Sequence, residues 1–202
     1  MRMFITDCIR DYVQSYPEER NTLSRWGEPL VAYAAARDKL FAELSRAVSP
    51  THALPTDFLA SARTVISYFI PFDPSIIHSN IAGRYSSRAW VMAYLETQQL
   101  IKDLNVHLQS VIERQGYETV LVPPTLNYNQ EKHVCDWSQR YVAYIAGLGT
   151  FGLNNMLITA KGCGGRIGSL ITSMEVPATP RPADERCLYK ARGVCSQCIK
   201  RC

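Results

Sequence analysis

The stretch AGLGTFGLNNMLITAKGCGGRIGSLITS, residues 146–173, decides the fold because it joins a run of glycines to two apolar segments. Residues 153–159 and 167–173 are apolar runs of strand length, and the connector between them is rich in glycine. Two strands joined by so short a glycine-containing segment predict a β-hairpin.

The glycines at the start of this stretch have two interpretations. Gly147, Gly149 and Gly152 follow an expected helix and precede a strand, whereas a dinucleotide-binding fingerprint needs a strand, a glycine turn and then a helix. The order of elements therefore excludes a Rossmann fold. The glycines serve either a tight turn or the close approach of backbone amides to a flat or anionic ligand.

The rest of the chain reads as a mixture of helices and strands. Apolar residues at steps of three and four predict helices, and short β-branched runs closed by prolines predict strands. The segments from 176 onward carry prolines and then cysteines, so residues 1–175 are expected to form an α+β domain and 176–202 a linker with a cysteine-rich module. The predicted helices are 4–16, 28–48, 87–115 and 137–146, and the predicted strands outside 146–173 are 64–70 and 117–122.

The last sixteen residues, CLYKARGVCSQCIKRC, hold four of the seven cysteines. The final three have the C-x2-C-x3-C spacing that ferredoxin-type segments use to bind iron–sulfur clusters, while Cys187 lies eight positions before Cys195 instead of three. Four thiolates could hold one 4Fe–4S cluster or a zinc ion, or remain unligated. The candidate metal ligands are Cys187, Cys195, Cys198 and Cys202.

Composition narrows the class of protein. Of 202 residues, 47% are hydrophobic and 20% charged, as in ordinary globular proteins, and the net charge of +4 forms no basic stripe for RNA. No window reaches the roughly 18 apolar residues of a membrane span, and the charged N-terminus lacks a signal-peptide core. We expect a cytoplasmic protein without membrane contact. In that reducing compartment, an odd number of cysteines favours metal or redox chemistry over disulfides.

Three segments in this order resemble a known family. ARTVISYFIPF at 62–72, GRYSSRAWVMAYLE at 83–96 and GLGTFGLNNMLIT at 147–159 are similar to segments of epoxyqueuosine reductases and related iron–sulfur proteins of anaerobes. The terminal cysteines resemble that family's ferredoxin-like module. The resemblance covers most of residues 55–202.

The resemblance implies a cobalamin-binding, nitroreductase-like sheet flanked by helices, followed by a module with 4Fe–4S clusters. Electrons from a reductant protein or small-molecule donor would pass through the clusters to a base-off corrinoid that reduces the substrate. This oxidoreductase function would place a set of residues beside the cofactor. They are Arg84, Tyr85, Gly147, Leu148, Gly149, Phe151, Gly152 and Asn155.

Departures from the family pattern affect the catalytic residues and the clusters. The family's proton-donating aspartate aligns with His133, and Asp136 lies three positions later, so these two are the catalytic candidates. Leu153 replaces a lysine of the family, and the charge pattern does not support a tRNA substrate. Two clusters need eight ligands, so we expect that the chain is truncated within the module, or that it holds at most one cluster, or that it holds none. The alternative is an electron-transfer or zinc-stabilised binding protein without an active-site cofactor.

Overall fold

The computed structural model describes residues 1–123 and 126–201, which form fourteen helices and strands. Their order along the chain is α1 (Arg2–Glu19), β1 (Leu30–Ala35), α2 (Leu40–Ala47), α3 (Pro55–Phe58), β2 (Thr64–Pro71), α4 (Pro74–Ser79), α5 (Arg88–Glu113), β3 (Thr119–Leu121), α6 (Gln139–Ile145), β4 (Gly149–Phe151), β5 (Leu157–Thr159), β6 (Gly165–Thr172), α7 (Leu188–Arg192) and α8 (Gln197–Arg201). The mixture of helix and sheet confirms the predicted α+β class.

A four-stranded antiparallel sheet with the order β1-β2-β6-β3 forms the centre of the molecule. Strand β2 is buried over all eight residues, because β1 and β6 flank it and helices cover both faces. This confirms the strand predicted at 64–70. Strand β3 pairs with β6 over only three residues, from Thr119 opposite Thr172 to Leu121 opposite Leu170. Among the described residues, no strand pairs with residues 165–169 of β6 on that side.

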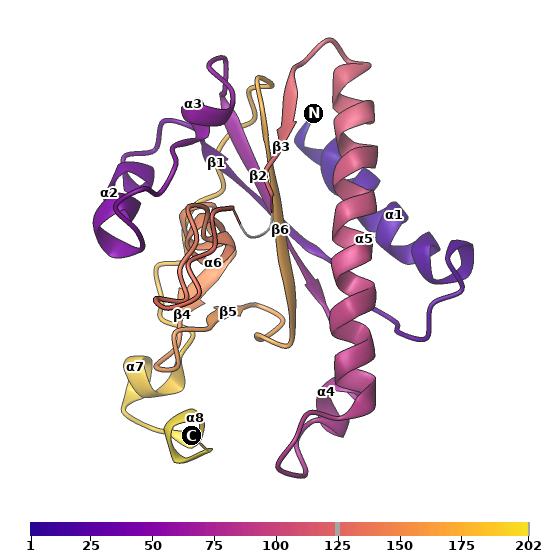
Figure 1. Ribbon diagram of the computed structural model, residues 1–202, viewed down its shortest axis with the longest axis vertical. Helices are drawn as coiled ribbons and strands as arrows, with labels where there is room; N and C mark the ends of the chain where they lie inside the picture. The colour runs from indigo at the N-terminus through magenta and orange to yellow at the C-terminus, as the bar shows by residue number, and fades with distance from the viewer. Residues whose placement is uncertain (124–125, 202) are drawn as a thin grey trace.

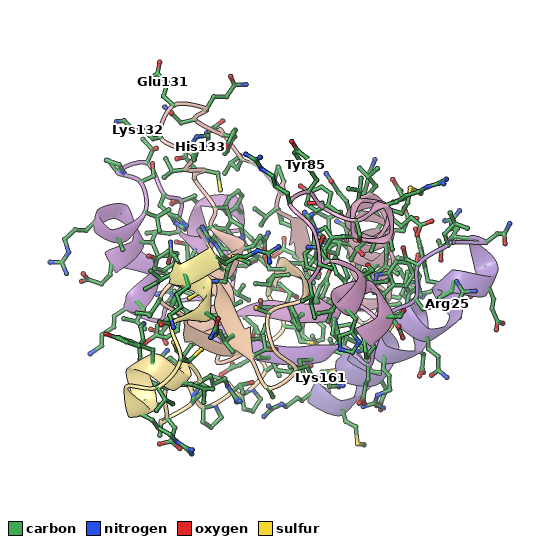
Figure 2. The ribbon with its side chains drawn as sticks, turned by 90° about the horizontal axis from the view of Figure 1, so that it is seen from below. Arg25, Tyr85, Glu131, Lys132, His133 and Lys161 are labelled. Carbon is green, nitrogen blue, oxygen red and sulfur yellow. The ribbon has the colours of Figure 1, made fainter. Side chains whose placement is uncertain are left out.

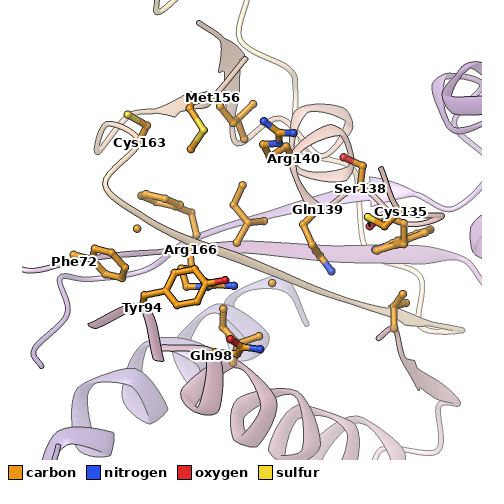
Figure 3. A pocket seen from close by; sticks show the side chains of 18 of the residues that line it. Phe72, Tyr94, Gln98, Cys135, Ser138, Gln139, Arg140, Met156, Cys163 and Arg166 are labelled. Carbon is orange, nitrogen blue, oxygen red and sulfur yellow. Dashed lines mark hydrogen bonds between the residues drawn. The ribbon is translucent and has the colours of Figure 1, made fainter. Parts of the chain in front are cut away.

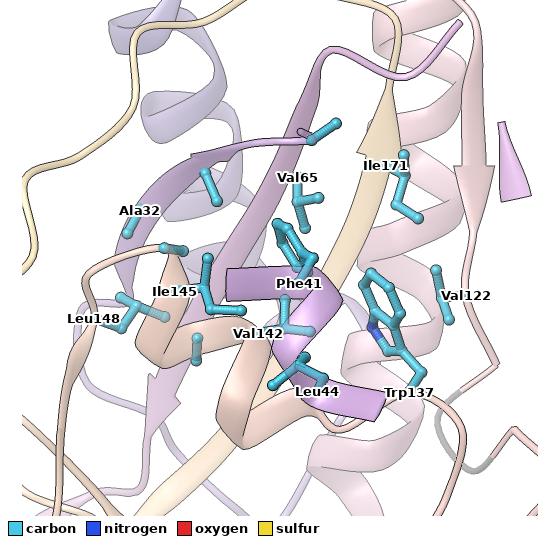
Figure 4. Close-up of a cluster of buried hydrophobic side chains, with 14 of the residues drawn as sticks. Ala32, Phe41, Leu44, Val65, Val122, Trp137, Val142, Ile145, Leu148 and Ile171 are labelled. Carbon is cyan, nitrogen blue, oxygen red and sulfur yellow. The ribbon is translucent and has the colours of Figure 1, made fainter. Parts of the chain in front are cut away.

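Helices cover the two faces of the sheet in separate layers. Helices α1 and α5 lie on one face, and α2, α3 and α6 lie on the other (Figure 1). Alternation along β6 sends Leu170 to the α1 and α5 side, where it packs with Leu104, and sends Ile171 to the α6 side. Figure 4 shows the second core, in which Phe41 and Trp137 lie among aliphatic side chains from the sheet and α6.

The long helix α5 confirms the helix predicted at 87–115. The Ser87 hydroxyl accepts a hydrogen bond from the Trp90 N–H and caps the first turn. Leu100, Leu104 and Leu108 recur every four residues and are fully buried against the sheet. Gly116, at a φ of +85°, follows the helix end. Within the described ranges, no helix is both long enough and apolar enough to cross a membrane.

The helix predicted at 28–48 is wrong in its first half. Residues 30–35, LVAYAA, form β1 and pair with β2 in register from Leu30 opposite Phe69 to Ala35 opposite Thr64. The alanines indicated a helix, but a hydrogen-bonding partner strand and burial outweigh their local preference. The helix predicted to end at Pro17 instead continues through it to Glu19.

The hairpin predicted from 153–159 and 167–173 is also wrong. Strand β5 pairs with β4, forming a separate two-stranded sheet, while β6 pairs with β2 and β3. The glycine-rich connector lets the chain leave the small sheet and enter the central one. The linker after β6 is more firmly held than its prolines suggest, because Met174 and Val176 are buried and the Thr179 N–H donates to the Tyr33 carbonyl.

Candidate functional site

A cavity of about 480 Å³ opens along the free edge of β6. Helix α5 forms one wall, and the loop before α6 with strand β5 forms the opposite wall (Figure 3). The residues that line it are Phe69, Phe72, Trp90, Tyr94, Gln98, Ile101, Asn105, Val122, Cys135, Trp137, Ser138, Gln139, Arg140, Met156, Leu157, Cys163, Gly165, Arg166, Ile167 and Gly168.

The cavity exists because β3 is short and the start of β6 is rich in glycine. Strand β3 ends opposite Leu170, and in the part of the chain that the structure describes no further strand pairs with residues 165–169 of β6 on that side. A Cβ on Gly165 would lie 2.7 Å from the Phe69 ring. The absence of a side chain at Gly165 of β6 therefore leaves room for the Phe69 ring, which comes from the neighbouring strand β2. A second groove of about 580 Å³ continues from the cavity between α5 and β3, and the two share Gln98, Ile101, Asn105 and Val122.

Both charged side chains of the cavity wall are arginines, Arg140 and Arg166. The Arg140 Nη1 donates to the Asn155 carbonyl at 2.7 Å, which holds the guanidinium beside β5. The Arg166 guanidinium lies 4.0 Å from the centre of the Tyr94 ring, a cation–π arrangement. No aspartate, glutamate or histidine belongs to the lining residues, all of which the structure describes. The wall therefore favours a ligand with acceptor atoms or negative charge.

Trp137 forms the inner end of the cavity. Its side chain is fully buried, stacks on Phe41 and contacts the Phe58 ring edge-on. His52 lies behind it, and its Nε2 accepts the Ser138 N–H at 3.0 Å while its Nδ1 faces the Ala53 carbonyl at 2.9 Å. Burial lowers the pKa of His52. A neutral imidazole with Nδ1 protonated therefore fixes the loop that leads into α6.

The predicted glycine segment lies behind the cavity wall and not in it. A Cβ on Gly147 would lie 2.9 Å from the Pro180 carbonyl oxygen, and a Cβ on Gly149 would lie 2.8 Å from the Ile158 carbonyl carbon. Leu148 is buried in the core, and Phe151 packs between Tyr141 and Tyr144. The close main-chain contacts at Gly147 and Gly149 agree with the first interpretation of these glycines, in which they serve a tight turn.

The other members of the predicted set have mixed positions. Gly152 is fitted against Ile158, while Asn155 touches the site through its carbonyl, which receives Arg140. Arg84 and Tyr85 do not line the cavity, and Tyr85 is 84% exposed on the loop before α5 (Figure 2). The cofactor contacts assigned to these residues stay predictions.

The two catalytic candidates lie apart from the lining residues. His133 is exposed at a φ of +52° near the outer edge of the molecule, and its Nδ1 lies 2.8 Å from the Tyr128 hydroxyl (Figure 2). Asp136 is buried, and its carboxylate accepts hydrogen bonds from Thr51, Asn127 and Ser49 at 2.6, 3.0 and 3.2 Å. The hydrogen bond from Thr51 contributes most to lowering the pKa of Asp136. The ionised carboxylate of Asp136 therefore connects the loop that contains Ser49 and Thr51 to the loop that contains Asn127.

We expect Asp136→Asn to lower the free energy of unfolding at pH 7 by about 1–2 kcal/mol, because hydrogen bonds to an ionised carboxylate are the stronger kind. The folded-state pKa lies below the ordinary 3.8, so the contribution is complete above that value and is lost as the pH falls through the folded-state pKa. Urea titrations at several pH values should show the difference from wild type shrinking in acid. Asp184→Asn, at an exposed linker carboxylate, is the control, and an equal effect there would contradict the assignment.

The short helices α7 and α8 lie below β4 and β5 (Figure 1); Cys187 immediately precedes α7, Cys195 lies between the two helices and Cys198 is on α8. Hydrogen bonds from the main-chain N–H groups of Lys190 and Leu153 lower the pKa of the Cys187 thiol. Those of Gln197 and Ser196 lower the pKa of Cys195, and the charge of Cys187 acts against this lowering. The lowered pKa values of Cys187 and Cys195 favour the thiolate, the form that binds metals.

The four predicted metal ligands are only partly described. Cys187 is buried, Cys195 is exposed and Cys198 is half-buried, while Cys202 lies outside the described residues. Across residues 1–123 and 126–201, no three histidine, cysteine or acidic side chains converge in a metal-binding geometry. The donor chemistry of Cys187 and Cys195 fits iron–sulfur or zinc ligation.

The cysteine segment is attached to the hairpin of β4 and β5. The Arg186 N–H donates to the Thr150 hydroxyl at 2.8 Å, which ties the residue before Cys187 to strand β4. On the same hairpin, Met156 and Leu157 line the cavity. One short hairpin therefore separates the thiol group from the cavity.

The sequence analysis did not identify Gln139, Arg140 or Arg166 as site residues. These side chains come from α6 and β6, which meet at the cavity only after the central sheet has formed. One available signal was the arginine within GGRIG, because a charged residue in an otherwise apolar strand suggests a cavity or an edge. The other was the polar run SQR at the start of the helix expected at 137–146.

Comparison with known proteins gives a fold but no sequence-level relative. No family model and no curated protein sequence matches the chain. Among solved structures, epoxyqueuosine reductase from Streptococcus thermophilus is 16% identical with a TM-score of 0.51, and the match covers 93% of this chain and 50% of that one. Epoxyqueuosine reductase from Bacillus subtilis, solved with its catalytic aspartate loop swung out of the active site, is 15% identical with a TM-score of 0.54 and coverages of 96% and 51%.

A third structure is an epoxyqueuosine reductase with an epoxyqueuosine-modified tRNA stem loop, at 15% identity, a TM-score of 0.53 and coverages of 96% and 52%. The chain thus spans about half the length of the solved proteins that it matches. At these identities the likeness establishes the fold, which is that of the epoxyqueuosine reductase structures.

Proposed function

We propose that this chain, which has the fold of epoxyqueuosine reductase structures, is the ligand-binding part of a reductase. In this proposal, a cysteine-bound iron–sulfur centre in the tail passes electrons to a group held in the cavity beside β6. A reductant protein or a small-molecule donor supplies the electrons. The proposal rests on the fold and on the relation between the cavity and the terminal cysteines.

The position of the hairpin of β4 and β5 is the single observation that carries the proposal. The Arg186 N–H, next to Cys187 in the sequence, donates to the Thr150 hydroxyl of this hairpin at 2.8 Å, and Met156 on the same hairpin lines the cavity. A redox centre bound at Cys187 would therefore be separated from a ligand in the cavity by a thin layer of protein.

The tail has donor groups that suit an iron–sulfur centre. Cys187 and Cys195 have lowered pKa values, Cys198 lies nearby in the sequence on α8, and Cys202 is the proposed fourth ligand. Lys190, Arg192, Lys200 and Arg201 give this segment a positive charge without any acidic residue. Such a surface lowers the energy of an electron-rich cluster.

The cavity offers donors to a corrinoid. Gln139, Arg140 and Arg166 would hold the carboxamide and phosphate oxygens of that cofactor, and aromatic residues such as Trp90 would contact its ring. No histidine belongs to the lining, which suits the base-off form that the family resemblance implies. A bound iron–sulfur centre would supply single electrons, and a bound corrinoid would supply a strongly reducing metal.

Anaerobic reconstitution of the full chain with iron and sulfide tests the electron-transfer part of the proposal. We expect uptake of iron with charge-transfer absorption in the visible range, and a base-off spectrum when cobalamin is then added under reducing conditions. Failure to take up iron would refute the iron–sulfur assignment, and tight zinc uptake instead would favour a zinc-stabilised binding protein. Iron uptake without any spectral change of added cobalamin would refute the corrinoid assignment alone.

A further inference from the structure

Helices α7 and α8, in the last described part of the chain, leave their large side chains in solvent. They lie at one end of the molecule, below β4 and β5 (Figure 1), and neither helix contains a buried residue. The large apolar side chains of residues 188–201 are each between 45% and 58% exposed: Leu188, Tyr189, Val194 and Ile199. We call the exposed side chains of residues 188–201 the tail face. Apolar side chains left in solvent by a segment that buries none of them are typical of a surface that binds a partner.

The tail face also accounts for the net charge of the protein. The whole chain contains 22 basic and 18 acidic residues. Residues 187–202 contain no acidic residue and four basic ones, so residues 1–186 hold equal numbers of both kinds; the four are Lys190, Arg192, Lys200 and Arg201. All four side chains are exposed, and among the described residues no carboxylate forms an ion pair with any of them. Positive charge is therefore concentrated beside apolar surface.

Two hydrogen bonds hold the tail against the body of the protein, one near each end. The Arg186 N–H donates to the Thr150 hydroxyl of β4 at 2.8 Å. The Arg201 Nη2 donates to the Gly83 carbonyl, in the loop before α5, at 2.7 Å. The segment is thus attached to the hairpin of β4 and β5 and also to the loop before α5. A surface that is already held in place loses less conformational entropy when a partner binds it.

The chemistry of the tail face selects the class of partner. Aliphatic side chains such as Leu188, Val194 and Ile199 need an apolar counterpart, which a protein surface offers and a sugar–phosphate backbone does not. The exposed lysines and arginines need negative charge opposite them. A second copy of this chain would bring like charges together, which costs free energy. The occupant that fits is therefore an acidic protein with a small apolar patch.

We propose that the tail face is the docking surface of a small acidic electron-carrier protein. The inference rests on the proposed function, because it gives the chemistry of the reductant protein and the surface on which that protein binds. Cys187, Cys195 and Cys198, which would hold the redox centre, belong to the same segment. The carrier is oxidised by one electron, which the iron–sulfur centre accepts, and no bond is formed or broken. An oxidised 4Fe–4S centre with four thiolate ligands carries fewer negative charges than the tail has positive ones, so the tail face stays positive when the centre is bound.

Plant-type ferredoxin, a small acidic protein with one 2Fe–2S cluster, is the probe for this surface. Calorimetric titration of the full chain with oxidised ferredoxin should show binding that weakens about tenfold between about 20 and 200 mM salt, because salt screens exposed charges. Cytochrome c, a basic electron carrier, should not bind under the same conditions. The titrations are made with the chain as isolated and again after anaerobic reconstitution with iron and sulfide.

A charge-reversal pair tests the basic residues of the tail face. Arg192→Glu with Lys200→Glu should weaken ferredoxin binding at least about tenfold at low salt and remove most of its salt dependence. Lys39→Glu with Lys132→Glu is the matched control, because it changes the net charge equally at exposed residues before α2 and in the loop 126–136. Lys132 lies well apart from the yellow helices α7 and α8 in Figure 2. The control pair should therefore keep most of the wild-type affinity.

An apolar substitution tests the other half of the tail face. Ile199→Ser should weaken ferredoxin binding about tenfold at every salt concentration, the effect expected when one aliphatic side chain is lost from an interface. Leu23→Ser, at a leucine that is 75% exposed after α1, is the control and should leave the affinity unchanged. Since α7 and α8 bury no residue, the tail variants should unfold thermally like wild type, which circular dichroism verifies.

The comparison of partners decides the outcome. Ferredoxin binding that is no tighter than that of cytochrome c, or that both charge-reversal pairs weaken equally, would overturn the inference. Displacement of ferredoxin by a lower concentration of a short RNA hairpin would make the tail face a nucleic-acid surface, and a dimer in sedimentation that Ile199→Ser dissociates would make it a contact between copies. Iron uptake without ferredoxin binding would refute the docking surface alone, whereas ferredoxin binding without iron uptake would refute the proposed redox centre alone.

Discussion

Replacing Trp137 by alanine is expected to lower the free energy of unfolding by about 3–5 kcal/mol, the range measured for removing a large aromatic side chain from a protein core. The side chain is fully buried and stacks with Phe41 and His52 at centroid distances of 6.1 and 5.8 Å. Its removal leaves a void between α2, α6 and the sheet (Figure 4). The Ser169 hydroxyl, which accepts the indole N–H at 3.1 Å, also loses its donor.

Trp137→Phe is the matched control, because it keeps most of the aromatic packing and removes only the indole N–H. Its cost should be about 1–2 kcal/mol, the contribution of one buried hydrogen bond with some loss of volume. Urea unfolding followed by circular dichroism measures both variants. A loss of less than 1 kcal/mol in Trp137→Ala would mean that the aromatic layer on this face relaxes to fill the void, contrary to the packing described here.

Cys187→Ser is expected to abolish stable binding of the iron–sulfur centre, because it removes the thiolate nearest to the body of the protein. The main-chain N–H groups of Lys190 and Leu153 that stabilise the Cys187 thiolate would then face a hydroxyl, which does not ionise at neutral pH. Iron and acid-labile sulfide per chain should fall to near background after anaerobic reconstitution. The absorption and paramagnetic signals of the cluster should disappear with them.

Cys8→Ser controls for general effects of losing a cysteine. Cys8 lies on α1, where its sulfur is 3.3 Å from the His107 Nε2, and it belongs to a different face of the molecule from the tail. This variant should bind as much iron as wild type. If Cys187→Ser retained full iron content, Cys187 would not be a ligand and the observation that carries the proposed function would lose its meaning.

Local patterns predicted the long elements and the fold class well. The apolar residues of α5 recur at helical spacing over seven turns, and β2 is a continuous apolar run closed by prolines, so both elements carry their own signal. The segment 30–35 lacked such a signal, because its alanines favour a helix until β2 offers a partner. The pairing of β4 with β5 depends on close contact at Gly149, which no period in the sequence reveals.

The site could be predicted less well than the fold, for a physical reason. A cavity forms where a sheet is interrupted, and here β3 pairs with β6 over three residues only, so that within residues 1–123 and 126–201 no strand continues along the first part of β6. Arg140 and Arg166 meet there from different elements, so neither residue stands out in its own segment. The terminal cysteines were recognisable because their spacing is local, while their attachment to the body through Thr150 and Leu153 was not.

The hairpin of β4 and β5 makes the two halves of the proposed site thermodynamically reciprocal. A ligand that displaced Met156 or Leu157 would also shift the hairpin to which the Arg186 N–H, beside Cys187, is bonded through Thr150. Linkage then requires that oxidation, reduction or metal loading at the thiolates change the affinity of the cavity by the same factor that cavity occupancy changes the chemistry of the thiolates. Through this short hairpin, the redox state of the cysteine tail would change the affinity of the cavity beside β6 for its ligand.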